Sequence, residues 1–317
     1  MYKSFRAALS KELEKCAKLY PDLVVLNADC ARALQLSNFT KRFPDRMICV
    51  GISEADMLTT AAGLSAAGML PVVVGFSMFT TAKPFEQIRQ AIAYPNLNVK
   101  IIATHAGLCV GKDGATHQIL EDIAIMRTLP NFKIFVAADV SETSSAISAM
   151  LLHDGPAYLR LGRDMAQDIF EEGKDVKVGG SDVLRQGKDV AIVACGLMVE
   201  QSLKAAEILK ADGIDATVIN AYSLKPLDSA TIIQKAKENG AVITAEDHSI
   251  IGGLGGAVAE LLASSYPVPM EFVGVKDLFG ESGEQDELYR KYGLTAEDIA
   301  KAALRAMDRK DRSVQNV

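Results

Sequence analysis

Residues 47–76 read MICVGISEADMLTTAAGLSAAGMLPVVVGF, and this stretch decides the fold. Its two ends, 47–52 and 70–76, are short apolar runs of the kind that form buried β-strands. Between them, residues 54–67 carry apolar side chains at helical spacing, and Gly68 is placed to end the helix. A strand, a helix and a second strand in this order predict part of a parallel sheet.

The same alternation continues along the chain. In the first half, strand-like runs cover 23–28, 99–104, 133–138 and 157–161, and helix-like segments cover 84–94, 118–129 and 142–152. In the second half, strand-like runs at 189–194, 216–220, 241–245 and 271–275 alternate with helical segments at 199–211, 228–238, 254–263 and 296–307. We therefore predict an α/β protein of two domains, 1–165 and 181–317, each a mostly parallel sheet flanked by helices, with a linker at 166–180.

Composition limits the classes of partner. The 317 residues carry a net charge of -6, and basic residues alternate with acidic ones, so nucleic acid is not expected as a partner. The five cysteines form no Cys-x-x-Cys pair and no zinc-like spacing, which is typical of reduced intracellular thiols. No apolar run reaches the length of a membrane span. These features predict a cytoplasmic protein that binds neither nucleic acid nor membranes.

Two of the four histidines, His105 and His117, flank a glycine-rich loop that contains Asp113. His105 follows a strand-like run that ends at Thr104, and His117 precedes a helix expected from Gln118. Such strand and helix ends face one crevice, where α/β folds bind ligands. Histidine exchanges protons near neutral pH, and a carboxylate can bind a sugar hydroxyl or fix an imidazole tautomer. The loop is a candidate site for a polar substrate, although a polar helix-start loop would also explain one histidine.

An acid and two aromatic residues form a second candidate site. Glu54 opens a predicted helix after a buried strand, with Ser53 as the N-cap and Asp56 completing a pattern like a capping box. Because an acid in the first helical turn also suits the helix dipole, Glu54 alone has an ordinary structural explanation. Phe76 and Phe79 lie where the next strand ends, and their rings can either stack on a flat heterocycle or belong to the core.

Taken together, these segments resemble transketolase. The likeness rests on RMICVGISE (46–54), AGLSAAG (62–68), FSMF (76–79), QIR (87–89), DGATHQ (113–118), EDHSIIGG (246–253) and ESG (281–283). It covers nearly the whole chain and implies the pyrimidine-binding and C-terminal domains of this thiamine-diphosphate family. The chain would then be the C-terminal section, the β-type subunit of a split transketolase.

The resemblance implies how the cofactor is held. Glu54 would hydrogen-bond the pyrimidine ring of thiamine diphosphate and act as a catalytic residue, for which it must carry a proton. Burial favours that protonated form, whereas the helix dipole opposes it. Phe79 and Phe76 would stack on the pyrimidine, and Asp29 matches an acidic position near the cofactor.

By the same resemblance, four residues would bind the sugar substrate: His105, Asp113, His117 and Arg163. His117 would also relay protons as a catalytic residue, and Arg163 would hold the substrate phosphate with its guanidinium group. Two further phosphate contacts of the family are missing, because its amino-terminal arginine falls at about Tyr2 or Lys3 and its serine at about Ala33. A differently substituted or other anionic sugar is therefore possible.

The metal and diphosphate site of the family is also missing. Such enzymes bind Mg²⁺ or a similar ion through a Gly-Asp-Gly segment with a downstream Asn, and this sequence has no Gly-Asp-Gly. The resemblance therefore implies a separate N-terminal-section subunit that holds the metal, an active site at the subunit interface and an α2β2 assembly. We expect the complex to transfer a two-carbon ketol unit from a ketose to an aldose, and this chain to be inactive alone.

Three alternatives remain open. Pyruvate dehydrogenase β subunits share the Glu-helix-Phe arrangement, although the Asp-Gly-Ala-Thr-His-Gln run fits them poorly. Deoxyxylulose-phosphate synthase is closer, but it usually carries three domains on one chain. Release of carbon dioxide from pyruvate would favour either of these decarboxylating enzymes. A non-catalytic binding module would have no need for Glu54, His105, Asp113 and His117 together.

Overall fold

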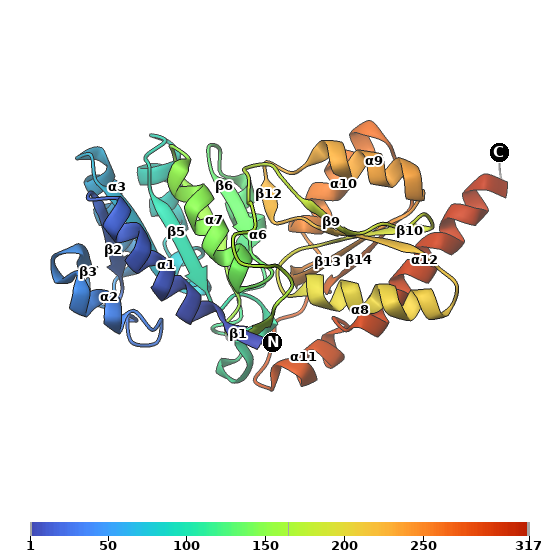
Figure 1. The fold of residues 1–317 in the computed structure, drawn as a ribbon, viewed down its shortest axis with the longest axis horizontal. Coiled ribbons are helices and arrows are strands. Elements are labelled where there is room, and N and C mark those ends of the chain that lie inside the picture. The colour runs from blue at the N-terminus through green and yellow to red at the C-terminus, as the bar shows by residue number, and fades with distance from the viewer. Residues whose placement is uncertain (1, 164, 316–317) are drawn as a thin grey trace.

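Two sheets organise the residues that the structure describes, 2–163 and 165–315 (Figure 1). In this computed structural model, the first sheet contains, in order across the sheet, β12 (Ser223–Lys225), β6 (Lys133–Val136), β7 (Ala157–Arg160), β5 (Lys100–Thr104), β4 (Leu70–Phe76), β2 (Leu23–Asn27) and β3 (Met47–Cys49). β12 runs antiparallel to β6, and the other pairings are parallel.

The second sheet has the order β14 (Met270–Val275), β13 (Val242–Ser249), β10 (Val190–Ala194), β11 (Ala216–Asn220) and β9 (Asp182–Arg185). Only β9 is antiparallel to its neighbour. The prediction of an α/β protein with two mostly parallel sheets is therefore confirmed.

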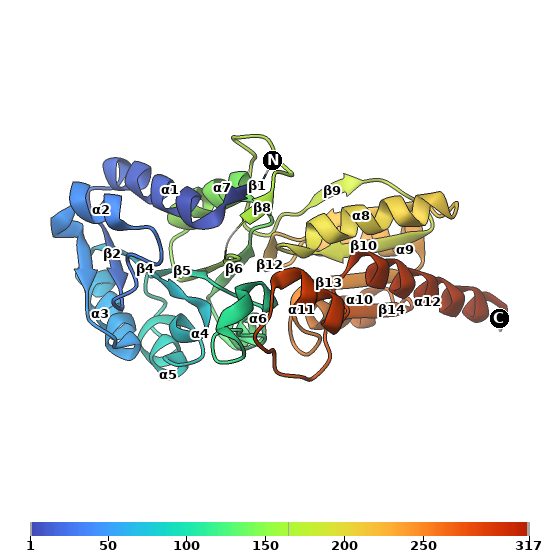
Figure 2. The ribbon, with the colours of Figure 1, turned by 90° about the horizontal axis from the view of Figure 1, so that it is seen from below.

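Helices cover both faces of the first sheet (Figure 2). One face carries α1 (Phe5–Leu19), α2 (Ser37–Arg42) and α7 (Val140–Leu152), and the other carries α3 (Glu54–Ala66), α4 (Ser77–Thr80), α5 (Phe85–Gln87), the π-helix η2 (Ile88–Ala93) and α6 (Asp122–Thr128). Successive side chains of a strand point to opposite faces. Val73 therefore packs into one apolar core, while Val72 and Val74 pack into the other.

The second sheet is covered in the same way (Figure 1). α9 (Ser229–Asn239) and α10 (Leu254–Ser265) pack together on one face. The other face carries α8 (Met198–Ala211), α11 (Gln285–Tyr292) and α12 (Ala296–Gln315), of which α8 and α12 pack against each other.

The two units are joined by more than the segment between them. β1 (Tyr2–Ser4) pairs with β8 (Met165–Gln167) as a separate antiparallel ribbon. β12 leaves the second half of the sequence and extends the first sheet. One apolar cluster includes Ile134 of the first sheet as well as Val193 and Ile219 of the second. Residues where the two sheets meet are therefore in contact with elements of both units.

Three local expectations were wrong. The helix expected over 118–129 begins at Asp122, because the preceding residues are drawn into a bridge between Ile119 and Ala106. Ser53 occupies the N-cap of α3, but its side chain makes no capping hydrogen bond, so the capping box is absent. The strand before it, β3, is only partly buried, because it lies at the edge of the sheet.

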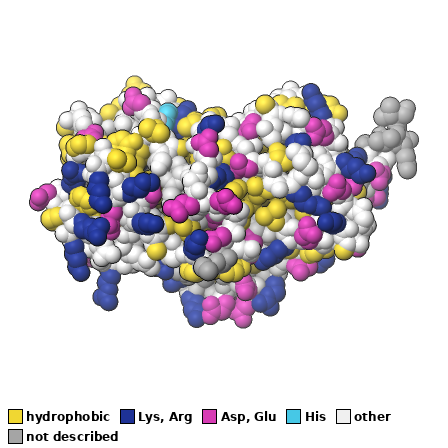
Figure 3. Space-filling view, in the orientation of Figure 1, with side chains coloured by type: hydrophobic (Ala, Val, Ile, Leu, Met, Phe, Trp, Pro, Cys, Tyr) yellow, Lys and Arg dark blue, Asp and Glu magenta, His cyan; other side chains and the backbone are white. Residues whose placement is uncertain are grey.

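The surface shows no separation of charge on the face in Figure 3, where basic and acidic side chains are intermixed over both units. Among the described residues, no helix combines the length and the apolar character that crossing a bilayer requires.

Candidate functional site

The turn after β4 presents both candidate aromatic residues. β4 ends at Phe76, and the short helix α4 follows at once and carries Phe79. The ring centroids of Phe76 and Phe79 lie 6.3 Å apart. Gly75 permits this sharp turn, because a Cβ atom there would lie 2.4 Å from the Thr80 side chain. The sequence thus places two aromatic rings at the end of a buried strand.

The two histidines meet at this aromatic pair. The His105 ring lies 4.1 Å from the Phe76 ring, and the His117 ring lies 5.1 Å from the Phe79 ring in an edge-on arrangement. His105 follows β5 directly and has a φ of 59°, a conformation that is uncommon for residues other than glycine. The predicted clustering of the histidines is therefore present, although it is built around the aromatic turn.

His105 is held in its neutral form. Burial, followed by the positive charges of Arg6, Arg163 and His117, lowers the pKa of His105 to about 3. Its Nδ1 atom lies 2.7 Å from the hydroxyl of Thr104. A neutral imidazole with one nitrogen fixed in this way can donate or accept a hydrogen bond through the other.

Glu54 lies in a pocket beside the aromatic turn. The pocket has a volume of about 170 Å³, and its lining includes Asp29, Cys30, Glu54, Met57, Phe76 and Phe79. Three separate segments thus bring the acid, both rings and Asp29 to one cavity. Asp29 adopts a φ of 59° directly after β2.

Lys83 is a member of this site that the sequence did not reveal. Glu54 is only 6% exposed, and its Oε2 atom accepts a hydrogen bond of 2.5 Å from Nζ of Lys83. The side chain of Lys83 is half exposed. Because 29 residues separate the two in sequence, no local pattern indicates the pair.

Asp113 and Arg163 form an ion pair of 3.3 Å between Oδ2 and Nη1. Asp113 ends the 3-10 helix η3 (Leu108–Asp113), and Arg163 follows β7. Arg163 also donates to the carbonyl oxygen of Val110. The structure therefore ties Arg163 to the loop between the two histidines.

Arg6 is a cation near His105 that the sequence analysis did not single out, whereas Tyr2 and Lys3 make contacts elsewhere. The Tyr2 hydroxyl bonds Glu200 at 2.9 Å, and Lys3 pairs with Asp168 at 2.9 Å. Nη1 of Arg6, in contrast, donates to the carbonyl oxygen of Ala33 at 3.0 Å, and its charge acts on His105.

The second domain anchors the site without lining the Glu54 pocket. Glu246 accepts hydrogen bonds from the backbone of Leu254 and Gly255 and so caps α10. Asp247 accepts one from the backbone nitrogen of Leu108, in the histidine loop. Within the described ranges, no group of three or more His, Cys, Asp and Glu side chains could hold a metal ion.

Comparisons with known proteins point to one family. Residues 2–168 match the transketolase pyrimidine binding domain, and residues 179–299 match the transketolase C-terminal domain. The chain is 43% identical, over 97% of each chain, to a protein of Methanocaldococcus jannaschii described as a transketolase C-terminal section. It is 41% identical to the 6-deoxy-6-sulfo-D-fructose transketolase subunit SqwH of Clostridium sp. (strain MSTE9), over 91% of this chain and 90% of that one.

A solved structure supports the same relationship. It is a split gene transketolase in an inactive β4 tetramer, with a TM-score of 0.91 and 44% sequence identity. The match covers 96% of this chain and 98% of that chain.

Proposed function

This chain belongs to the transketolase family, and we propose that it is the pyrimidine-binding subunit of a split transketolase that depends on thiamine diphosphate. The enzyme transfers a two-carbon ketol unit from a ketose to an aldose, and its active site forms where this chain meets a separate subunit. The observation that carries the proposal is the pocket that Glu54 shares with Phe76 and Phe79.

The pocket fits one half of the cofactor. Its walls are largely apolar and aromatic, with the carboxyl group of Glu54 as a polar group for a ring nitrogen. A volume of about 170 Å³ is small beside the roughly 300–1,000 Å³ of pockets that enclose a whole drug-sized ligand. It therefore suits the pyrimidine ring, while the diphosphate is bound outside this pocket.

Glu54 supplies the proton in this proposal. When bound, thiamine diphosphate supplies the electron sink for cleavage of a carbon–carbon bond. Glu54 holds a proton on its carboxyl group and donates it in a hydrogen bond to the pyrimidine nitrogen. In the free chain that carboxylate accepts a hydrogen bond from Lys83, so the ammonium group of Lys83 has to move away.

The sugar lies between the histidines and the two arginines. His105, neutral in this site, and His117 bond the sugar oxygens, and His117 relays protons to them. Asp113 binds a hydroxyl group. Arg6 and Arg163 both act on His105 and favour a negatively charged end of the substrate. The relative SqwH acts on a sugar with a sulfo group, which agrees with an anionic substrate whose charged group need not be phosphate.

The partner is an N-terminal-section subunit that holds Mg²⁺ or a similar ion together with the diphosphate, in an α2β2 assembly. Supporting this, the similar split transketolase of β chains alone is an inactive tetramer. In our proposal this chain is likewise inactive without its partner.

The test is to assay this chain with and without a partner subunit carrying a Gly-Asp-Gly segment. We expect ketol transfer that requires both chains, thiamine diphosphate and Mg²⁺. Activity of this chain alone would refute the split site. Carbon dioxide release from pyruvate would instead support the alternative of a decarboxylating enzyme. This chain is also 34% identical to a 1-deoxy-D-xylulose-5-phosphate synthase, and it spans half the length of that protein.

A further inference from the structure

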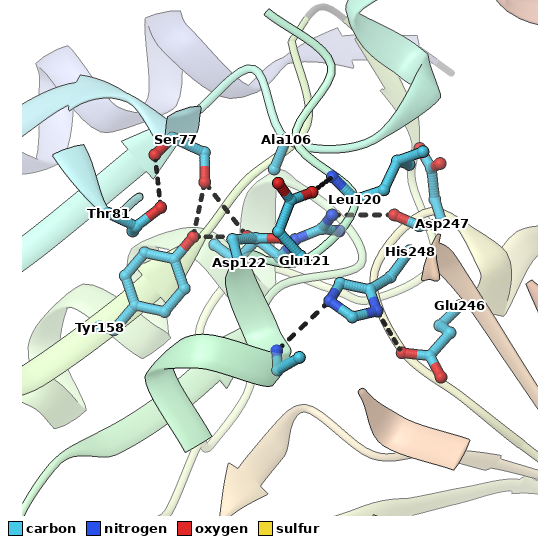
Figure 4. A network of polar contacts seen from close by, with 12 residues as sticks. Ser77, Thr81, Ala106, Leu120, Glu121, Asp122, Tyr158, Glu246, Asp247 and His248 are labelled. Atoms are coloured by element: carbon cyan, nitrogen blue, oxygen red, sulfur yellow. Dashed lines mark hydrogen bonds and ion pairs between the residues drawn. The ribbon is translucent and has the colours of Figure 1, made fainter. Parts of the chain in front are cut away.

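A buried polar cluster begins next to the aromatic turn, at Ser77, and contributes no residue to the lining of the Glu54 pocket. Figure 4 shows this cluster from close by. We call it the Asp122 cluster, and its members are Ser77, Asp122, Tyr158, Arg160 and Asp247. All five residues are at most 5% exposed. They come from α4, α6, β7 and β13, so the cluster spans both domains.

One carboxylate oxygen holds the centre of the cluster. Oδ2 of Asp122 accepts hydrogen bonds from the Ser77 hydroxyl at 3.1 Å, the Tyr158 hydroxyl at 2.6 Å and Nε of Arg160 at 2.7 Å. The hydroxyls of Ser77 and Tyr158 also lie 2.8 Å apart. Burial would raise the pKa of Asp122, but the charges of Arg160 and His248 and the hydrogen bonds from Arg160 and Tyr158 outweigh it and hold that pKa below its usual value. An ionised acid with three donors is a strong and directional anchor.

The cluster is hydrogen-bonded to the aromatic turn, residues 76–79, through Ser77. Ser77 is the first residue of α4 and directly follows Phe76. Its backbone oxygen accepts a hydrogen bond of 2.7 Å from the Thr81 hydroxyl, which closes the turn. The position of the Phe76 and Phe79 rings therefore depends on where Asp122 holds Ser77.

The same cluster also contacts the histidine loop, the segment between His105 and His117, through Arg160 and Asp247. Nη2 of Arg160 donates to the backbone oxygen of Asp247 at 2.8 Å. The Asp247 carboxylate then accepts hydrogen bonds from the backbone nitrogen of Leu108 at 2.8 Å and from the Tyr289 hydroxyl at 2.9 Å. Gly107 lets the loop approach this closely, since a Cβ atom there would lie 2.4 Å from Oδ2 of Asp247.

We propose that the Asp122 cluster is a positioning device that fixes the aromatic turn relative to the histidine loop, with Ser77 as its contact to the turn. The inference rests on the proposed function, because the turn is where the cofactor ring would bind. Functional groups must be held within about 0.5 Å of their productive geometry, and a displacement of about 1 Å can cost 100-fold in rate. The residues of the cluster act through Phe76, Phe79 and the histidines and touch no substrate.

The test compares matched losses of one hydroxyl group. Ser77→Ala is paired with Ser202→Ala, whose buried hydroxyl bonds the Met198 carbonyl in α8. Tyr158→Phe is paired with Tyr222→Phe, whose hydroxyl makes a contact of 3.5 Å to the Lys177 backbone. Each chain is combined with the partner subunit, and titration calorimetry gives Kd for thiamine diphosphate with Mg²⁺ while assays give kcat and KM.

We expect Ser77→Ala and Tyr158→Phe to raise the cofactor Kd by about three- to tenfold, as the loss of a hydrogen bond implies. They should also lower kcat, with the sugar KM little changed. The control variants should change Tm by a similar amount but leave Kd and kcat unaltered. If all four variants change only Tm, the cluster is merely structural and the proposal is wrong.

A second measurement needs no cofactor. In ¹H–¹³C NMR spectra of the free chain, the His105 ring protons feel the ring current of Phe76, whose centroid is 4.1 Å away. Ser77→Ala should shift these signals, whereas Ser202→Ala should not. Unchanged His105 signals in Ser77→Ala would overturn the positioning role even if the wild-type complex showed no thiamine dependence. Failure of the proposed function alone would leave the expected NMR shift intact.

Discussion

The buried carboxylate of Glu54 and the ammonium group of the half-exposed Lys83 side chain form an ion pair, with 2.5 Å between Oε2 and Nζ, at the pocket that Phe76 and Phe79 line. The pair makes the free chain unlike a cofactor-bound site, in which Glu54 would donate a hydrogen bond. Cofactor binding and the Lys83 contact therefore compete for one carboxyl group.

Replacing Lys83 with methionine should tighten cofactor binding. Lys83→Met removes the cation that occupies the Glu54 carboxyl group in the free chain, so that this group is available to the cofactor. We expect the Kd of the reconstituted complex for thiamine diphosphate to fall several-fold by calorimetry. Lys83→Arg, which keeps the charge, is the control. Weaker binding in Lys83→Met than in Lys83→Arg would mean that Lys83 assists the cofactor.

Replacing the acid itself should remove activity without unfolding the chain. Glu54→Gln should lower kcat by about 100-fold or more, the usual cost of losing a proton-transfer group. Glu12→Gln is a matched control, because Glu12 is also 6% exposed and pairs with a solvent-exposed lysine, Lys15. Equal kcat values for the two variants in the complex would remove Glu54 from the chemistry.

The two arginines should decide the charge of the substrate. Arg6→Ala and Arg163→Ala should each raise KM for an anionic sugar about tenfold or more, since hydrogen bonds to charged groups are strong. KM for an uncharged sugar should change little. Lys3→Ala, at a position onto which the amino-terminal arginine of the family falls, should leave both values unchanged. A selective rise of KM for the anionic sugar in Lys3→Ala would mean that Lys3 takes the place of the missing arginine.

His105 should make the fold sensitive to acid. Its pKa is about 3 in the fold and 6.5 in the reference state, chiefly because of burial. Between these values the unfolded chain binds a proton that the folded chain rejects, so stability is lost as pH falls from 6.5 toward 3. Denaturant titrations at several pH values should show a shallower loss for His105→Gln than for the wild type. The less buried His153→Gln should show a smaller change.

The two sheets could be predicted from the sequence because apolar runs such as 70–76 and 100–104 form central strands that helices cover on both faces. The short strands β1, β8, β9 and β12 were not predicted. They form because they pair with strands that are distant in sequence. The start of α6 was misplaced for a similar reason. Gln118 looks like a helix start, but its side chain donates hydrogen bonds to the carbonyl oxygens of Gly111 and of Glu281, the second of which is distant in sequence.

Some residues of the candidate site could likewise be predicted from the sequence, and others could not. Phe76, Phe79 and His105 were found because each directly follows or ends a recognisable strand. Lys83 and Arg6 were missed, because their places depend on contacts between elements. The roles of the site residues and the domain boundaries stay predictions.

The most direct measurement is a crystal structure of the complex of this chain and its partner subunit with thiamine diphosphate and Mg²⁺. We expect the pyrimidine ring between Phe76 and Phe79, a Glu54 oxygen within about 2.6–3.2 Å of a ring nitrogen, and Lys83 displaced. A cofactor bound elsewhere, with Glu54 still paired to Lys83, would contradict this expectation.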